Sequence, residues 1–129
     1  MAGSSAGLHE PAERLDEGVI DRHRATVSIM EELEAVDWYD QRATATSDPA
    51  LAEILRHNRD EEKEHAAMTL EWLRRNDPVL DQHLRTYLFT DSDVLSIEEE
   101  AEHGGGTDAS TPTGGSLGIG SLRGSENTR

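Results

Sequence analysis

Two proline-containing breaks divide the middle of this 129-residue chain into segments with helical patterns. In the first break, Ser47-Asp48-Pro49, aspartate is a favoured helix N-cap and proline a favoured first helical residue. The second, Asn76-Asp77-Pro78, ends a helix because proline has no backbone N–H and restricts the residue before it. The sequence therefore predicts three helices, over about 16–44, 49–75 and 78–88.

No strand is expected beside these helices, because no stretch alternates β-branched or aromatic residues with polar ones. Two long helices joined by a short connection form an antiparallel hairpin, which is half of a four-helix bundle. The predicted fold is therefore all-α. It consists of an antiparallel two-helix hairpin plus a short third helix, and it dimerises to complete a four-helix bundle.

Both ends of the chain are rich in Gly, Ser, Thr and acidic residues, which bury too little apolar surface to offset the entropy of ordering. We therefore expect one helical domain with flexible extensions. The predicted divisions are a flexible N-terminal segment 1–15, the helical domain 16–98, a flexible linker 99–115, a docking peptide 116–123 and a tail 124–129.

The docking peptide is predicted from an apolar island in the polar C-terminal part, Ser116-Leu117-Gly118-Ile119-Gly120-Ser121-Leu122-Arg123. In an extended chain Leu117 and Ile119 would point to the same side and could fill pockets on a partner. The glycines would let the two backbones approach closely.

Charge narrows the possible ligands. The chain has 12 Lys and Arg against 27 Asp and Glu, a formal net charge of -15, so it should repel nucleic acid and anionic membrane surfaces and attract metal cations. It has no apolar run long enough to span a bilayer and no signal-peptide pattern at its N-terminus, so a cytoplasmic location is expected. Because it contains no cysteine, any metal must be held by oxygen and imidazole.

Each long helix carries a glutamate within its apolar stripe. At 100° per residue, Glu32 lies in a stripe made by Ala25, Ile29, Val36 and Tyr39. Glu62 lies in a stripe made by Leu51, Leu55, Ala66, Thr69 and Leu73, with His65 on the same flank. Burying a carboxylate costs several kcal/mol unless a cation or strong hydrogen bonds compensate, so a bound metal would explain both acids.

The ligand pattern suggests a site with two metals. An inward Glu, paired with a Glu-x-x-His motif on the neighbouring helix, is used twice in di-iron carboxylate bundles, and this chain has it once. Two hairpins related by a two-fold axis would bring together two copies each of Glu32, Glu62 and His65. Four carboxylates balance two divalent ions, and this donor set suits iron or manganese. Glu-x-x-His taken alone more often lies on a solvated helix face.

Other acidic residues could guide metal to such a centre. His57, Glu61 and Glu64 stack on a different face of the second helix, while Glu31 and Glu34 share an edge of the first. These residues could form weak, hydrated cation sites or simply a solubilising surface. Trp38, beside Glu31 and Glu34, predicts a contact between subunits, because interfaces are enriched in tryptophan. Tyr39 could hydrogen-bond a metal ligand or be an ordinary core tyrosine.

Four helical segments and the tail resemble the encapsulated ferritin family. The helical segments are EELEAVDWY (31–39), HNRDEEKEH (57–65), TLEWLRR (69–75) and LRTYLFT (84–90). In the tail, Leu117-Gly118-Ile119-Gly120-Ser121-Leu122 resembles the encapsulin localisation sequence of that family.

The resemblance implies a ferritin-like bundle assembled as a ring-shaped decamer, a pentamer of dimers, with its ferroxidase centre between two chains. It implies that Glu32, Glu62 and His65 hold iron, that Glu31 and Glu34 form an access site, and that His57, Glu61 and Glu64 bind metal on the outer face. Calcium or other divalent ions could occupy these accessory sites. The counterpart of Trp38 lies at a subunit interface.

The predicted function is oxidation of Fe(II) to Fe(III) at a di-iron centre, delivering iron for mineral storage inside an encapsulin nanocompartment. The expected catalytic residues are Glu32, Glu62, His65 and Tyr39. The expected contacts to the encapsulin shell are Leu117, Gly118, Ile119, Gly120, Ser121 and Leu122. Two alternatives remain: a di-metal peroxidase, because the ligand set does not fix the oxidant, and a non-catalytic metal-binding cargo protein.

Overall fold

The computed structural model describes residues 7–105, and the predicted docking peptide lies outside this range. Residues 7–105 contain one 3-10 turn and four α-helices, and no strand. These elements are η1 (Ala12–Arg14), α2 (Glu17–Ala45), α3 (Pro49–Arg75), α4 (Pro78–Tyr87) and α5 (Val94–Gly105). The predicted all-α fold is confirmed, and no helix in the described range is both long and apolar enough to cross a bilayer.

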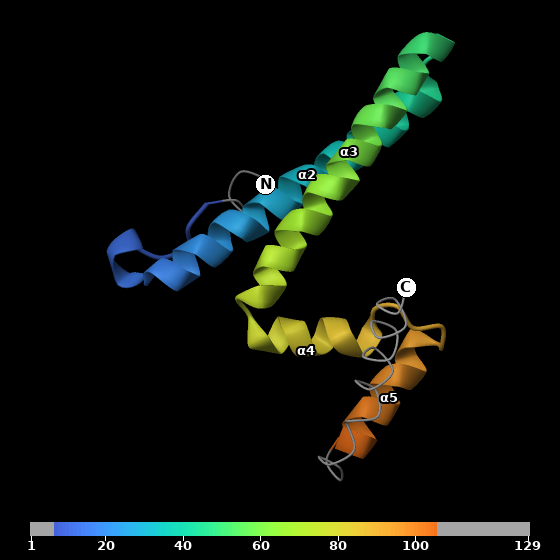
Figure 1. Ribbon diagram of the computed structural model, residues 1–129. Coiled ribbons are helices and arrows are strands. Elements are labelled where there is room, and N and C mark those ends of the chain that lie inside the picture. The colour runs from blue at the N-terminus through green and yellow to red at the C-terminus, as the bar shows by residue number, and fades with distance from the viewer. Residues whose placement is uncertain (1–6, 106–129) are drawn as a thin grey trace, which may run out of the picture. The chain divides into compact units, whose positions relative to one another are not determined.

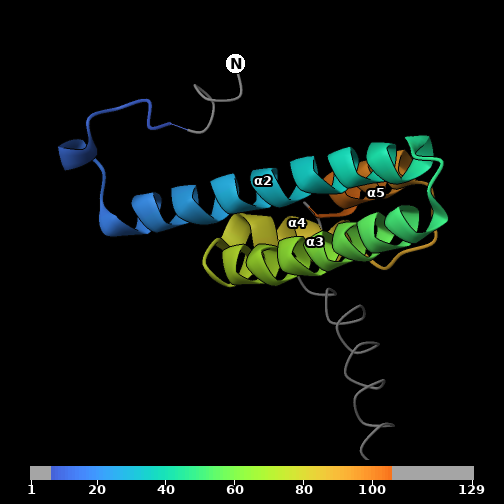
Figure 2. The same cartoon turned by 90° about the horizontal axis from the view of Figure 1, so that it is seen from above.

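The two long helices, α2 and α3, form an antiparallel hairpin (Figure 1), and Figure 2 shows the short connection between them. Asp16 caps α2 by accepting a hydrogen bond from the backbone N–H of Val19 at 2.8 Å. Asp48 caps α3 by accepting one from the N–H of Ala50 at 3.0 Å. Both helices therefore begin within one residue of their predicted starts, and the predicted cap at Asp48 is confirmed.

An ionic cluster fixes the corner between α3 and α4. Arg74 donates hydrogen bonds to both carboxylate oxygens of Glu71, at 2.8 and 2.9 Å, and a short one to Asp81 at the start of α4. Asp77 caps α4 by accepting from the N–H of Leu80 at 3.0 Å. Arg74, and secondly Arg75, lowers the pKa of Glu71 to about 2, so this carboxylate stays ionised at neutral pH.

The hairpin has almost no core of its own. In the described part of the chain the buried residues are all alanines: Ala25, Ala43, Ala52 and Ala66. Larger apolar side chains remain partly exposed, among them Trp72 at 40% and Met68 at 59%. A hairpin that buries so little apolar surface is poorly stabilised by itself, so its apolar flanks are suited to a partner.

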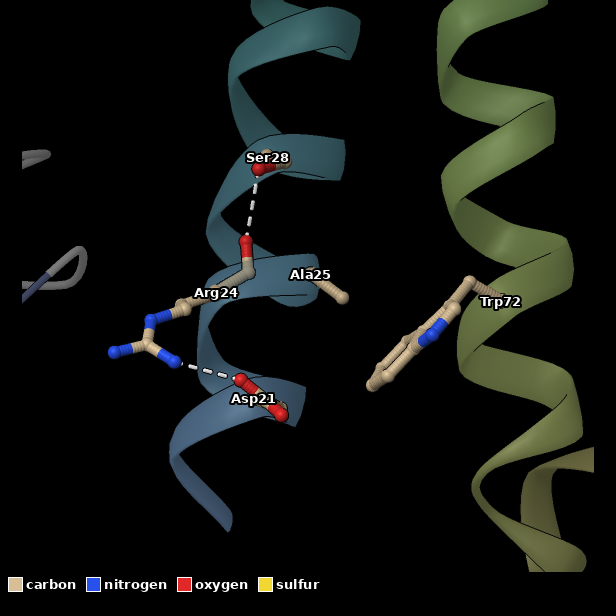
Figure 3. A pocket seen from close by; sticks show the side chains of 5 residues that line it. All are labelled: Asp21, Arg24, Ala25, Ser28 and Trp72. Atoms are coloured by element: carbon tan, nitrogen blue, oxygen red, sulfur yellow. Dashed lines mark hydrogen bonds and ion pairs between the residues drawn. The ribbon is translucent and has the colours of Figure 1, made fainter. Parts of the chain in front are cut away.

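A groove of about 400 Å³ on the hairpin illustrates this incomplete packing. Figure 3 shows the Trp72 ring, from α3, directed towards the small Ala25 side chain on α2. The rest of the groove wall comes from Ser28 and from an ion pair of 2.7 Å between Asp21 and Arg24. The tryptophan therefore lies against α2 without being enclosed by it.

The chain divides into two compact units after Gln82, and α5 belongs to the second. This helix was not predicted: residues 99–105, assigned above to a flexible linker, form its second half. Asp93 supplies the missed start signal, because its carboxylate accepts hydrogen bonds from the backbone N–H and the hydroxyl of Ser96, at 3.1 and 3.2 Å. The acidic run after Ile97 consists of good helix formers, although its composition also resembles that of disordered segments.

We expect Phe89→Gly to raise the free energy of unfolding by about 1 kcal/mol, since a left-handed conformation costs an L-residue roughly that much. Phe89 follows α4 with a φ of 61° and its side chain is fully exposed, so the exchange relieves backbone strain without losing packing within the chain. Urea denaturation of the metal-free protein measures the change. Phe89→Ala keeps the Cβ atom, so its free energy of unfolding should rise little. An equal rise in both variants would show that backbone conformation is not the cause.

Candidate metal centre

Three of the predicted ligands converge on the inner side of the hairpin. Glu32 comes from α2, while Glu62 and His65 come from consecutive turns of α3. One possible ligand atom from each residue lies within 4.8 Å of the other two. His65 Nδ1 is 3.5 Å from Glu62 Oε1 and 3.6 Å from Glu32 Oε1. Among residues 7–105, no other three His, Asp or Glu side chains bring their ligand atoms this close.

The alanines of the hairpin explain why the helices can bring these ligands together. Ala25 and Ala43 lie on the same stripe of α2 as Glu32, and Ala66 follows Glu62 by one turn of α3. Small side chains on both facing stripes let the two helix axes approach closely. As a result both carboxylates are largely shielded, each with a side chain 24% exposed, while His65 is 43% exposed.

The two carboxylates are poorly compatible when both are charged. The pKa of Glu32 is raised above its ordinary value, first by a hydrogen bond with Glu62, then by burial, and then by the negative charge of Glu62. His65 opposes this rise, but does not cancel it. Without metal, Glu32 therefore binds a proton more readily than an isolated glutamate does, and a divalent cation would compete with that proton for the carboxylate.

The donor set fits a metal such as iron or manganese, because it combines carboxylate oxygens with one imidazole nitrogen and contains no thiolate. Nδ1 of His65 faces the two carboxylates, so it is the ring nitrogen available as a ligand. Three residues of one chain leave part of the coordination sphere of such a metal open. Water, substrate or a second chain must supply the remaining ligands.

The predicted accessory residues lie outside this cluster. On α3, His57 Nε2 is 3.7 Å from Glu61 Oε2, and both side chains are exposed. Glu64 is exposed on α3, and Glu31 and Glu34 are exposed on α2. The structure therefore brings together two of the three predicted outer-face ligands, and both accessory metal sites stay predictions.

Trp38 and Tyr39, in the last two turns of α2, both lie near the guanidinium group of Arg42. The guanidinium carbon of Arg42 lies 5.8 Å from the ring centroid of Trp38 and 5.8 Å from that of Tyr39. Trp38 is 47% exposed, and its predicted role at a subunit interface stays a prediction. Tyr39 lies on the Glu32 stripe, two turns further along α2, and its predicted catalytic role also stays a prediction.

Two interactions near the centre were missed from the sequence. Glu61 was assigned only to the outer face, yet its Oε1 is 3.9 Å from His65 Nε2. The four-residue spacing of this pair was the available signal. Arg59 of α3 pairs with Asp40 of α2 at 2.8 Å, across 19 residues of chain, and this interaction has no signature in local sequence.

Comparisons with known proteins identify the family of this chain. The model of the family described as EncFtn-like matches residues 7–91. An "Encapsulated ferritin-like protein" of Rhodospirillum rubrum is 63% identical over 130 residues, covering 96% of this chain and 93% of that protein. A "Ferritin-like protein" of Thermotoga maritima is 55% identical, covering 86% of this chain and 93% of that protein.

A solved structure shares the fold over the matched part of this chain. The crystal structure of a protein from Nitrosomonas europaea superimposes with a TM-score of 0.67 at 56% sequence identity. The match covers 68% of this chain and 97% of the Nitrosomonas chain.

Proposed function

This chain belongs to the EncFtn-like family, and from that premise we propose that it is a ferroxidase whose di-iron centre is completed by two copies of the chain. The observation that carries the proposal is the convergence of Glu32, Glu62 and His65 within 4.8 Å on the inner side of the hairpin. The ferritin-like names of the two relatives support iron as the metal.

Dimerisation follows from the ligand count. Each chain offers two carboxylates and one imidazole, so two chains offer four carboxylates and two imidazoles, which balance the charge of two Fe(II) ions. The alanine-only core and the exposed Met68 and Trp72 support a second copy as the missing half of the bundle. Further association of dimers into a ring-shaped decamer belongs to the same proposal.

The residues would favour oxidation through electrostatics. Carboxylates arranged around the iron stabilise Fe(III) more than Fe(II), because the ferric ion carries the larger charge. Each of two ferrous ions would give up one electron, and dioxygen would take both electrons and two protons from water to become hydrogen peroxide. Glu32 and Glu62 would supply the negative charge and His65 a nitrogen donor, so these side chains would hold the two iron ions close enough for both to be oxidised by one dioxygen.

The direct test follows ferric absorbance after anaerobic Fe(II)-loaded protein is mixed with dioxygen. We expect oxidation well above the rate in buffer. A parallel reaction with an equal amount of peroxide separates a ferroxidase from a di-metal peroxidase. A ferroxidase should oxidise Fe(II) with dioxygen, whereas a peroxidase should oxidise it faster with peroxide. A chain that binds iron stoichiometrically but leaves it ferrous would contradict the proposal and identify a metal-binding cargo protein.

In the proposed setting the protein works in the cytoplasm, inside an encapsulin nanocompartment that stores the ferric product. The name of the Rhodospirillum rubrum relative supports this enclosure. Residues 116–123 would dock the chain to the shell, with Leu117, Ile119 and Leu122 as the apolar contacts. Many tethered copies in one shell would compensate for weak individual contacts.

Deleting residues 116–129 should reduce loading into co-expressed encapsulin shells at least about tenfold, because avidity multiplies the loss of each contact. Ferrous oxidation by the purified truncated chain should stay near that of the full chain, since the metal ligands lie in α2 and α3. Loading is measured as the ratio of the two proteins in purified shells. Shells that fill equally with the truncated chain would exclude the docking role.

A further inference from the structure

The two ring nitrogens of His65 face different carboxylates. Nδ1 lies 3.6 Å from Glu32 and 3.5 Å from Glu62, on the side where the metal would bind. Nε2 lies 3.9 Å from Oε1 of Glu61, one helical turn earlier on α3. The imidazole is therefore placed between the inner pair of carboxylates and a third carboxylate outside that pair.

We propose that Glu61 is a positioning residue for the metal centre: its carboxylate holds Nε2–H of His65 and so directs Nδ1 towards the metal. This inference rests on the proposed metal centre. A metal-binding histidine commonly donates its second ring N–H to a carboxylate or carbonyl oxygen, which fixes the ring orientation and the tautomer and makes the ligand nitrogen a better donor. Glu61 is placed to do this from the same helix as His65, so no other element has to move.

The contact can tighten when metal binds. At 3.9 Å the separation is longer than a hydrogen bond, but contacts of this kind are often long before a site is occupied. The Glu61 side chain is 48% exposed, which leaves its carboxylate room to move towards Nε2. Fixing His65 through Nε2 leaves Nδ1 as the nitrogen directed at the metal.

Glu61 also faces a second imidazole. Its Oε2 lies 3.7 Å from Nε2 of His57, so His57, Glu61 and His65 form a line along α3 at intervals of four residues. Two roles for Glu61 thus compete: a ligand of an outer metal site together with His57, or an orienting partner of His65. In the first role, replacing His57 or Glu61 would weaken metal binding equally. In the second role, replacing Glu61 would weaken it more than replacing His57.

Titrating Co(II) alone into the metal-free full-length chain distinguishes these roles, since its d–d absorption bands report both affinity and the presence of a nitrogen ligand. Glu61→Ala should weaken Co(II) binding at the centre about 10- to 100-fold, the usual effect of losing a partner of this kind. Glu61→Gln should recover most of the affinity, because the amide oxygen can still accept from Nε2–H. Glu53→Ala, which removes an exposed charge elsewhere on α3, should behave like the wild type.

Two outcomes would overturn the positioning role. One is wild-type affinity and spectrum in Glu61→Ala; the other is an equal loss in His57→Ala and Glu61→Ala, which would assign Glu61 to the outer site. The metal centre is tested separately by Glu62→Ala. If that variant loses Co(II) binding while Glu61→Ala does not, only the positioning role is refuted; if it binds Co(II) normally, the proposed centre itself is refuted.

Discussion

Replacing Glu62 by alanine should lower the initial rate of ferrous oxidation by dioxygen at least about 100-fold, comparable to removing one preorganised electrostatic group from an active site. Glu62 belongs to the Glu-x-x-His motif of α3, and its carboxylate lies 3.5 Å from the ligand nitrogen of His65. In the proposed dimer the substitution removes two of the four carboxylates at once. The two metals would then lose both charge balance and a pair of ligands. Ferric absorbance after rapid mixing with dioxygen measures the rate.

The initial rate of ferrous oxidation should fall by a similar factor in Glu32→Ala and in His65→Ala. Each of these substitutions also removes two ligands from the proposed two-fold symmetric centre. Glu53→Ala serves as the matched control, since it deletes one exposed carboxylate from α3 outside the cluster. Circular dichroism of each variant separates loss of ligands from loss of the helices. Unchanged rates in all three ligand variants would refute the assignment of the centre.

The helix ends can be predicted from the sequence for a local reason. Asp16, Asp48 and Asp77 act through hydrogen bonds to residues two or three positions away, and Pro49 acts on its own backbone. Such signals are complete within a few residues, so they can be recognised without a structure. The inward positions of Glu32 and Glu62 can be predicted for a similar reason, because helical periodicity alone places them on apolar stripes.

Other features could not be predicted because they depend on side-chain direction or on distant residues. The Asp40–Arg59 pair joins two helices, so its existence depends on their packing. The contact between Glu61 and His65 depends on which way the imidazole ring faces, although their spacing permits it. In α5, the acidic composition predicts a linker although the same residues favour helix, and the helix begins after a cap at Asp93.

Adding Fe(II) under anaerobic conditions should shift the native mass from one chain to even multiples of it. Because the proposed dimer binds two metals, association should strengthen by about 10,000-fold when free metal is 100 times the dissociation constant of each site, if the metal binds only the dimer. The reason is electrostatic. A metal-free dimer would place four carboxylates in one poorly solvated site, where their mutual repulsion is not offset. Native mass spectrometry with Fe(II) and with a chelator measures the change.

The raised pKa of Glu32 gives the sign of the pH dependence. A carboxyl group whose pKa is raised by folding contributes stability that is complete below its ordinary value of 4.5 and is lost as the pH rises through the raised value. The free energy of unfolding of the metal-free chain should therefore fall as the pH rises above 4.5, while the metal-loaded assembly should weaken as acid protonates its ligands. Metal and proton thus replace one another at the same oxygens.

A double variant, Glu32→Gln with Glu62→Gln, removes the repulsion while nearly preserving shape. It should associate without metal and respond little to Fe(II), and its free energy of unfolding should no longer fall above pH 4.5, whereas Glu53→Gln should behave as the wild type. If the wild-type chain forms the same assembly with chelator as with Fe(II), and the double variant does not differ from it, then the charge of these carboxylates does not control association. The apolar flanks of the hairpin, with Met68 and Trp72, would then be sufficient to join the two chains.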